Sequence, residues 1–399
     1  MHQRIQSITI LLFFVLNITL ISCNNEFNGY IISVTNPLEL SRKSQTVELK
    51  LNELSDFTCT NVSNISVNDE QGNDILIQII DSNLDSIADG LLFQTDFLGN
   101  ETKQFTLVIE TPKDAVLGND LKTFCRFVPE RIDDFAWEND KVAFRTYGPK
   151  CQKMFEEGNP DGLISSGIDC WLKRVDYSII DKWYQKDLDG GSYHKDDGEG
   201  LDNYHVGTTR GCGGTAIVEG EGYVLSENYA NWKIIANGPI RSIFELGYPA
   251  YKVGKVDVTE VKRFTIDLGA NFYRCDVNYE CKEILKQAAV GIAHHNSNGE
   301  VYFNMDKGCF TYWESLDDSY LGTAVILDTK TLPIPETTIN SDVYNNWINF
   351  GLANNSFSYW AGFGWKKAGN FTSSDEWNEF VDKQSRLYKN QLTIKIEKL

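Results

Sequence analysis

Short segments in which apolar and polar residues alternate recur along this chain, and they restrict it to a fold built from β-strands. The clearest of them are residues 45–51, 105–109, 142–147 and 392–396. Alternation with a period of two places the apolar side chains on one face of a strand, as in a half-buried sheet. Helical periodicity is confined to short stretches such as Ser374 to Leu387, with Ser373 or Ser374 as the N-cap. We therefore expect an all-β protein with small helical additions.

The N-terminus has the features of a bacterial lipoprotein signal. His2 and Arg4 precede an apolar run, residues 8–21, which is too short to span a bilayer as a stable helix. The run ends in Leu-Ile-Ser-Cys, and Cys23 would become the acylated first residue of the mature chain. An ordinary secretory peptide with an unmodified Cys23 is the alternative. We expect residues 1–22 to be removed and the product to be an exported lipoprotein of the outer membrane, bound to the membrane only through its lipid.

The remaining length predicts two domains. Roughly 375 residues follow the signal, which is more than one hydrophobic core usually contains. Residues 23–115 are expected to form a small β-sandwich, and a polar break at 112–119 precedes an aromatic-rich region. Residues 116–399 are expected to form the large catalytic domain.

The net charge of −19 limits the partners. A negative field repels nucleic acid and anionic lipid, so neither is an expected partner. If the substrate is anionic, local Lys and Arg side chains must overcome this field. Clusters of basic residues therefore indicate where such a substrate would bind.

The cysteines do not predict a metal site. The eight besides Cys23 form no Cys-x-x-Cys pair and no Cys/His zinc spacing. Disulfides and buried free thiols both remain open for these residues: Cys59, Cys125, Cys151, Cys170, Cys212, Cys275, Cys281 and Cys309.

One segment resembles a calcium-binding loop. Asp81, Asn83 and Asp85 stand at alternate positions and Asp89 follows, but the loop glycine and the acidic twelfth residue are absent. A surface β-turn is the favoured interpretation, and a structural calcium ion is the alternative.

A first cluster of chemically versatile side chains contains Arg131, Trp137, Arg145 and Tyr147. Tryptophan stacks on the apolar face of a pyranose, and arginine binds a carboxylate or sulfate in a bidentate manner. A solvated strand edge with self-paired charges is the alternative. The interleaved aromatic residues favour a sugar-binding surface.

A second cluster lies on a segment flanked by glycines, and it follows a basic-aromatic run that contains Trp183. Its candidates are Tyr193, His194, Lys195, His205 and Arg210. A histidine beside Tyr, Lys and acids on a flexible loop is a candidate for proton transfer, although a lone histidine is more often structural. His294 and His295 end a later strand, where neighbouring side chains point to opposite faces.

Several strings in these regions resemble one family of secreted proteins from polysaccharide-degrading Bacteroidota, long described as a domain of unknown function. They are Phe127 to Arg131, Tyr147-Gly148-Pro149, Ser192 to Lys195, Gly198 to Asp202, Arg210 to Thr215, Asn237 to Arg241 and Trp360 to Trp365. The family includes the ulvan oligosaccharide dehydratase of marine bacteria. The resemblance implies that water is removed from a glucuronate or iduronate at the non-reducing end. The 4,5-unsaturated uronate would then pass to an unsaturated glucuronyl hydrolase, and the large domain would be a galactose-mutarotase-like β-supersandwich.

The chemistry of this elimination suggests roles for the candidates. Loss of the C5 proton next to a carboxylate requires neutralising cations, for which Arg131, Arg145 and Arg210 are suited. We expect His194 to be the base and Tyr193 the acid, with Lys195 or His205 as substitutes. Trp137 and Trp183 would stack on the sugars, and Tyr147 would line the site. No cofactor or metal is required.

Two other functions fit the same residues. A polysaccharide lyase abstracts the same proton but expels a sugar, so its product is shorter. A non-catalytic glycan-binding lipoprotein would bind without forming an unsaturated product. A sugar epimerase is a weaker third alternative, since it rests on the fold analogy alone.

Overall fold

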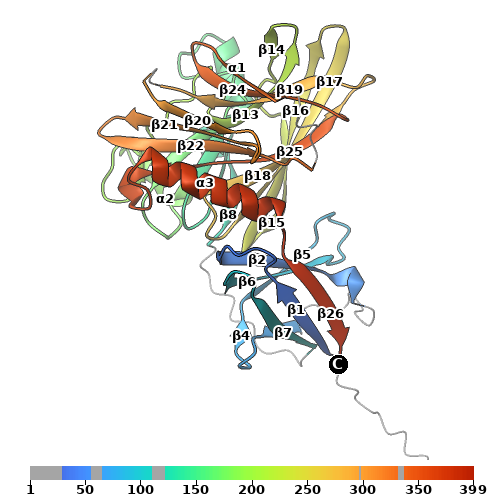
Figure 1. Cartoon of the computed structure of the whole chain (residues 1–399). Helices are drawn as coiled ribbons and strands as arrows, with labels where there is room; N and C mark the ends of the chain where they lie inside the picture. The colour runs from blue at the N-terminus through green and yellow to red at the C-terminus, as the bar shows by residue number, and fades with distance from the viewer. Residues whose placement is uncertain (1–28, 55–64, 110–121, 296–297, 331–336) are drawn as a thin grey trace, which may run out of the picture.

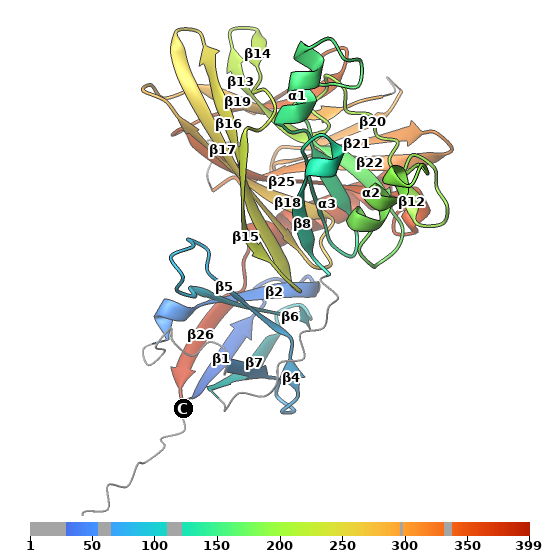
Figure 2. The same ribbon diagram turned by 180° about the vertical axis from the view of Figure 1, so that it is seen from behind.

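The chain folds into two β-sandwich units, one below the other in Figure 1 and seen from behind in Figure 2. The computed structural model describes residues 29–54, 65–109, 122–295, 298–330 and 337–399. Antiparallel sheets dominate both units, so the predicted all-β class is confirmed. No helix in this part of the chain has the length and apolar character to cross a membrane. Residues 1–22, Cys23 and Cys59 lie outside the described residues.

The small unit packs a five-stranded sheet against a three-stranded one. The first sheet has the order β26 (Thr393–Lys398), β1 (Gly29–Thr35), β7 (Thr102–Ile109), β3 (Ile65–Asn68) and β4 (Asp74–Ile75). The second has the order β2 (Arg42–Lys50), β6 (Gly90–Phe97) and β5 (Ile77–Ile80). Alternate residues of these strands, such as Ile32 and Val34, are fully buried between the sheets.

The C-terminal strand belongs to the small unit, which corrects the expected boundary of the large domain at residue 399. β26 pairs antiparallel with β1, so that Ile32 lies opposite Ile396. Ile394 and Ile396 pack on the core of the small unit. These apolar residues of β26 and the open edge of β1 explain the pairing, because both would otherwise be exposed to water.

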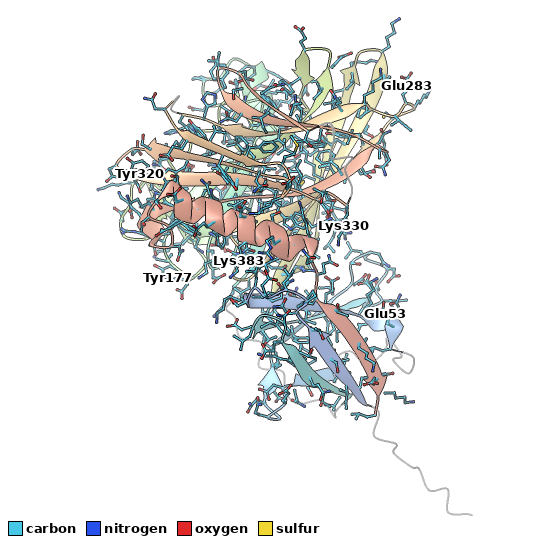
Figure 3. All side chains as sticks on the ribbon, viewed as in Figure 1. Glu53, Tyr177, Glu283, Tyr320, Lys330 and Lys383 are labelled. Atoms are coloured by element: carbon cyan, nitrogen blue, oxygen red, sulfur yellow. The ribbon has the colours of Figure 1, made fainter. Side chains whose placement is uncertain are left out.

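The two units share a small apolar interface. Ile80 and Leu92 of the small unit pack with Ile240 and Ile243 of the large unit. Next to them, Arg241 forms ion pairs with Glu48 of β2 at 2.6 Å and with Asp267 at 2.6 Å. Glu53 and Glu283, labelled in Figure 3, lie exposed on the small and the large unit, in keeping with the acidic composition.

The large unit consists of one long sheet covered by two shorter ones. The eight-stranded sheet has the order β15 (Asn231–Asn237), β16 (Arg241–Val253), β17 (Val256–Asp267), β18 (Phe272–Glu280), β25 (Ser356–Trp365), β22 (Ser319–Leu327), β21 (Cys309–Leu316) and β20 (Glu300–Asn304). One five-stranded sheet has the order β14 (Gly222–Val224), β13 (Cys212–Glu219), β19 (Gln287–Ala293), β24 (Asn345–Gly351) and β23 (Thr338–Ser341). The other has the order β12 (Gly200–Leu201), β11 (Asp169–Lys173), β10 (Ala143–Thr146), β9 (Asp134–Glu138) and β8 (Phe124–Val128).

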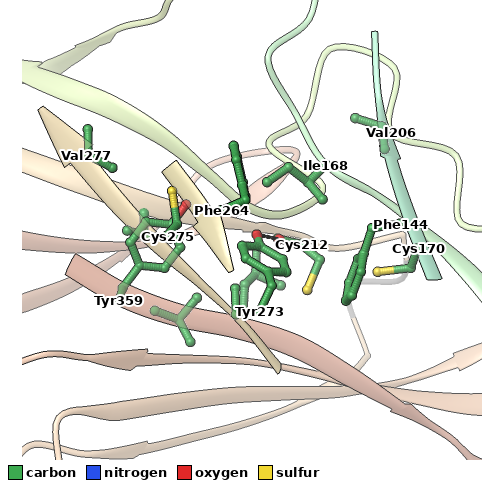
Figure 4. Close-up of a cluster of buried hydrophobic side chains, with 14 of the residues drawn as sticks. Phe144, Ile168, Cys170, Val206, Cys212, Phe264, Tyr273, Cys275, Val277 and Tyr359 are labelled. Atoms are coloured by element: carbon green, nitrogen blue, oxygen red, sulfur yellow. Dashed lines mark hydrogen bonds between the residues drawn. The ribbon is translucent and has the colours of Figure 1, made fainter. Parts of the chain in front are cut away.

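The core of the large unit lies between these sheets and is rich in aromatic residues and thiols. Figure 4 shows Phe144, Phe264 and Tyr273 together with Cys170 and Cys212. The seven cysteines of the described residues are free thiols, six of them buried. The structure therefore agrees with buried thiols and contains no disulfide between Cys275 and Cys281 among these residues.

In the described residues, three helices and three short 3-10 turns complete the fold. They are α1 (Pro149–Glu156), α2 (Ile180–Leu188), α3 (Ser374–Lys389), η1 (Leu51–Glu53), η3 (Pro129–Arg131) and η5 (Lys366–Ala368). The predicted N-cap of α3 is confirmed, since Ser373 Oγ accepts a hydrogen bond from Glu376 N. Trp377 and Val381, four residues apart, face the long sheet. A side chain at Gly322 of β22 would lie 2.6 Å from Trp377, so glycine permits this close contact.

The calcium-like segment forms a turn. Asp81 accepts hydrogen bonds from the backbone N–H groups of Leu84 at 2.7 Å and Ser86 at 2.8 Å. Asp89 accepts one from the Ser82 backbone at 3.0 Å. The segment thus has the geometry of the predicted surface turn, and a calcium ion there stays a prediction.

Candidate functional site

Arg145 lies at the centre of a buried group of charged side chains, here named the Arg145 cluster: Arg145, Asp134, Asp169, Asp202 and Tyr193. Arg145 Nε is 2.8 Å from Asp169 Oδ2, and its Nη2 is 2.7 Å from Asp202 Oδ2. Its Nη1 is 3.4 Å from Asp134 Oδ2 and donates to the Tyr193 hydroxyl at 3.1 Å. The guanidinium is therefore fully engaged by the protein, which makes it a structural centre and not a free anion-binding group.

Strand pairing brings these charges together. Arg145 of β10 is the register partner of Asp169 on β11, and β9 on its other side begins with Asp134. β12 pairs with β11, and Asp202 follows it directly. The ends of β9, β10 and β11 and the residue after β12 thus place their charged side chains together at one end of the sheet.

Burial shifts the pKa values of the cluster. Desolvation raises the pKa of the Asp169 carboxyl to about 7, and the nearby Asp202 adds to this, although Arg145 opposes it. Desolvation also raises the pKa of Asp134. Burial acts to lower the pKa of Arg145, but the three aspartates outweigh it and raise that pKa well above its usual range. The effects of burial follow from the cost of placing a charge away from water, and the effect of the aspartates on Arg145 follows from the attraction between opposite charges.

Of the three arginines expected to bind an anionic substrate, Arg131 is the one whose guanidinium remains available to a ligand. Its Nε donates to the Tyr193 hydroxyl at 3.3 Å, and its guanidinium forms no ion pair with a carboxylate of the described residues. Burial acts to lower the pKa of Arg131, but the Asp134 charge and the interaction with Tyr193 together outweigh it and raise that pKa. Arg131 is partly exposed, and Tyr193 is only 2% exposed. Tyr193 therefore lies behind Arg131 and does not face solvent, so its expected role as an acid in contact with substrate is wrong for this conformation.

His194 lies at the surface of the segment from residue 192 to residue 206, here named the histidine loop. Its side chain is 49% exposed. Its Nδ1 lies 2.7 Å from the Asp202 carbonyl oxygen and 3.7 Å from the Asp202 carboxylate. Because a carbonyl oxygen only accepts hydrogen bonds, Nδ1 must carry the proton, which leaves the lone pair of Nε2 free. This is the arrangement that a general base requires.

Near the end of the histidine loop, His205 lies next to His295 of the large unit. His205 is exposed and has a φ of 53°, a left-handed conformation that is unusual for a residue with a side chain. Its carbonyl oxygen lies 3.2 Å from Nε2 of His295, whose Nδ1 lies 2.8 Å from Oε1 of the buried Glu314. Lys195 is exposed on the same loop.

Four predicted ligand-binding residues lie in the core instead. Trp137 is fully buried against Phe144, and Trp183 is 3% exposed. Neither indole can stack on a sugar, because Trp137 lies in the core of the large unit and Trp183, on α2, packs against Trp171 of β11. Tyr147 is buried beside Arg145, and its ring lies 5.7 Å from the guanidinium. The burial of Trp137, Trp183 and Tyr147 corrects the prediction that these side chains bind a sugar.

Arg210 is the fourth of these residues. It is 2% exposed, and its Nη1 donates to Ser166 Oγ at 2.9 Å. Burial lowers its pKa to about 10. A side chain on Gly211, which has a φ of 58°, would lie 1.9 Å from the Ile168 carbonyl oxygen. The glycine-rich segment after Arg210 is thus a tight start of β13.

Two hollows among the described residues lie away from the histidine loop. One of about 510 Å³ is bounded by β16, β17, β18 and β25, with Glu245, Arg263 and Asp276 in its wall. Another of about 150 Å³ lies beside α1. Neither includes His194, His205 or Arg131, whose exposed atoms lie at the surface of the large unit.

Sequence reasoning missed the carboxylates that organise the site. Asp169 and Glu314 each stand in an otherwise apolar or aromatic strand, in Asp-Cys-Trp-Leu and Tyr-Trp-Glu-Ser. A charge in such a strand is buried and must have a partner of opposite sign, which is the signal that could have found them. His295 was noted as one of two adjacent histidines, without its partner.

Comparisons with known proteins give a family and a distant likeness. The model of a domain of unknown function, DUF4861, matches residues 34–394. An uncharacterized protein, P7, from Formosa agariphila is 39% identical over 397 residues, which are 97% of this chain and 99% of P7.

Solved structures resemble the chain more remotely. A glycosyl hydrolase family 38 protein and an α-mannosidase, both from Enterococcus faecalis, have TM-scores of 0.45 at 8% and 9% identity. Each match covers 92% of this chain, which spans only 47% and 46% of those proteins. Likeness at this level does not bear on activity.

Proposed function

The chain belongs to the DUF4861 family of domains of unknown function, and from its histidine loop we propose that it is a dehydratase of anionic algal oligosaccharides. It would remove water from a saturated glucuronate or iduronate at the non-reducing end and leave a 4,5-unsaturated uronate. The resemblance to ulvan-degrading proteins supplies the substrate class. The chemistry of the loop supplies the reaction type.

One observation carries this proposal: His194 has a free Nε2 lone pair at the surface, and its proton is fixed on Nδ1 by the Asp202 carbonyl oxygen. Proton abstraction from C5 would charge the imidazole. The Asp202 carboxylate, 3.7 Å from Nδ1, would stabilise that charge. A histidine oriented in this way typically contributes about 10²–10⁴-fold to a rate.

Arg131 supports the same reaction. Removal of a proton next to an ionised carboxylate places more negative charge on that group, and a nearby guanidinium lowers the cost. Arg131 is linked to His194 through Tyr193, whose ring centre lies 4.5 Å from that of the imidazole. A uronate carboxylate on Arg131 would therefore bring its sugar ring close to His194. Arg145 would hold Tyr193 and Asp202 in place through its hydrogen bond to the Tyr193 hydroxyl and its ion pair with Asp202.

The proposed location follows from the N-terminal signal. A lipid on Cys23 would hold the protein at the outer membrane, where exported enzymes encounter oligosaccharides, and an unsaturated glucuronyl hydrolase would act on the product. Metabolic labelling with palmitate, with Cys23→Ala as control, tests the anchor. Label on the variant would contradict it.

The activity is tested with the full chain and saturated ulvan oligosaccharides. The expected product has lost one water at unchanged length and absorbs in the ultraviolet as a conjugated enoate. His194→Ala should reduce the rate by at least about 100-fold. Asp197→Asn, at an exposed residue of the same loop, is the matched control and should keep the wild-type rate.

Other products would identify the alternatives. Shortened chains would indicate a polysaccharide lyase. Binding without any absorbance change would indicate a glycan-binding protein. Full activity of His194→Ala would show that the base has been assigned to the wrong residue.

A further inference from the structure

His295 and Glu314 form a histidine–carboxylate pair at the far end of the histidine loop. His295 follows β19 and Glu314 lies on β21, with 2.8 Å between Nδ1 and Oε1. Glu314 also accepts a hydrogen bond from the His295 backbone at 2.9 Å. The imidazole side chain is 18% exposed, and the Tyr204 ring packs on it at 4.7 Å between centres. A buried carboxylate thus fixes the position of a partly exposed imidazole.

Both nitrogens of His295 face acceptors, and this defines its protonation. Nδ1 faces a carboxylate and Nε2 faces the His205 carbonyl oxygen at 3.2 Å. Neither acceptor can donate, so both bonds exist only when the imidazole is a cation. Burial acts to lower the pKa of His295, but the hydrogen bond and charge of Glu314, together with the backbone hydrogen bonds to His205 and Tyr204, outweigh it and raise that pKa. The groups that face the imidazole are Glu314, Tyr204 and the His205 carbonyl.

Nε2–H is the proton that His295 can release. Nδ1–H is held by the charged Glu314, whereas Nε2–H is bound only to a neutral carbonyl on the loop. Loss of the Nε2 proton leaves a neutral histidine still bonded to Glu314. The labile proton therefore points toward the segment that carries His194 and His205.

The two histidines are held by the same short stretch of the histidine loop. The His194 imidazole is bonded to the carbonyl of Asp202, and the His295 imidazole to the carbonyl of His205. Three residues of chain span at most about 11 Å. Asn203 fixes the segment between them, because its Nδ2 donates to Asp317 Oδ2 at 2.7 Å. The two carbonyl groups that hold the imidazoles are therefore at most about 11 Å apart on one fixed segment, which keeps the base and the acid on the same part of the loop.

We propose that His295 is the catalytic acid that protonates the departing hydroxyl group, with Glu314 as its positioning residue; this inference rests on the proposed dehydratase function. His194 takes the C5 proton, and the C5–H electron pair becomes the second bond between C4 and C5. The C4–O bond breaks with its electrons on oxygen, and the Nε2 proton of His295 completes a water molecule. Solvent returns one proton from His194 to His295, so the cycle consumes nothing else. Tyr193, whose hydroxyl is bonded to both Arg131 and Arg145, does not serve as the acid.

The test compares two substrates and two adjacent histidines. The probes are a saturated uronate oligosaccharide and its 4-deoxy-4-fluoro analogue, since fluoride leaves without needing a proton. His295→Asn should lose at least about 100-fold in kcat on the natural substrate, with little change in KM, and recover most activity on the fluoride. His294→Asn is the matched control, because that side chain has other contacts, with Asp342 and Tyr312, and should leave both rates unchanged.

A second variant guards against misfolding. Glu314→Gln keeps the shape of the pair but removes the charge, so activity should start to fall at lower pH on the alkaline side. Equal losses of His295→Asn on both substrates, or full activity on the natural one, would overturn the inference. If the wild type converts neither substrate, the proposed function itself fails.

Discussion

Replacement of Asp169 by asparagine should remove a large part of the pH dependence of stability. The Arg145 cluster holds three aspartates against Arg145 and the nearby Arg131, so one negative charge is in excess. Asp169 Oδ1 is buried without a hydrogen-bond partner among the described residues. This carboxyl is therefore the one expected to bind a proton in the folded state.

The magnitude follows from its pKa. Burial raises the pKa of Asp169 from 3.8 to about 7, a displacement worth about 4 kcal/mol in total. Because the folded state binds the proton more tightly than the unfolded state, the stabilisation is fully present below pH 3.8 and is lost as the pH rises through about 7. Between pH 5 and pH 8 the wild type should lose about 2 to 3 kcal/mol through this group.

Urea denaturation at the two pH values measures this loss. Asp169→Asn should show a smaller fall in the free energy of unfolding from pH 5 to pH 8, by that amount. Asp257→Asn, at an exposed carboxylate, is the control and should fall as the wild type does. If the wild type and Asp169→Asn fall equally, Asp169 is ionised throughout, and the account of the cluster is wrong.

Two further changes test other parts of the structure. Trp137→Ala should destabilise the large unit by about 3–5 kcal/mol, because it opens a cavity in the core; a loss of sugar affinity at unchanged stability in urea would contradict its burial. Gly211→Ala should lower the thermal midpoint and reduce activity, because its Cβ would lie 1.9 Å from the Ile168 carbonyl oxygen. Gly220→Ala shares the positive φ but meets open space, so an equal drop in its midpoint would show that strain alone is responsible.

The strands could be predicted from sequence because alternation is a local property. Residues 142–147 and 392–396 form β10 and β26 as expected. Which strand pairs with which is a long-range property, so the joining of β26 to β1 was not predictable from either segment. The boundary of the large domain was wrong for this reason.

The sequence could indicate candidate segments for the site, but it could not indicate which of their side chains are buried. Strand alternation predicts that Arg145 faces solvent. In the structure β10 is covered on both faces, so its polar side is also buried. The same alternation puts Trp137 on the face of Phe135, which could have indicated that this tryptophan belongs to the core. His194 could be selected because loops carry reactive groups at the surface. Its orientation by Asp202 depends on the loop conformation, which the sequence does not encode in any local pattern.

The pairing of β26 with β1 has a consequence for biosynthesis. β1, the first strand of the described residues, receives an edge partner from β26, which lies more than 350 residues later in the chain. Until those residues emerge, β1 exposes a row of free backbone groups that can pair with another molecule. The small unit can thus be completed only once β26 is available, and a polypeptide without residues 393–398 would leave this edge of β1 open.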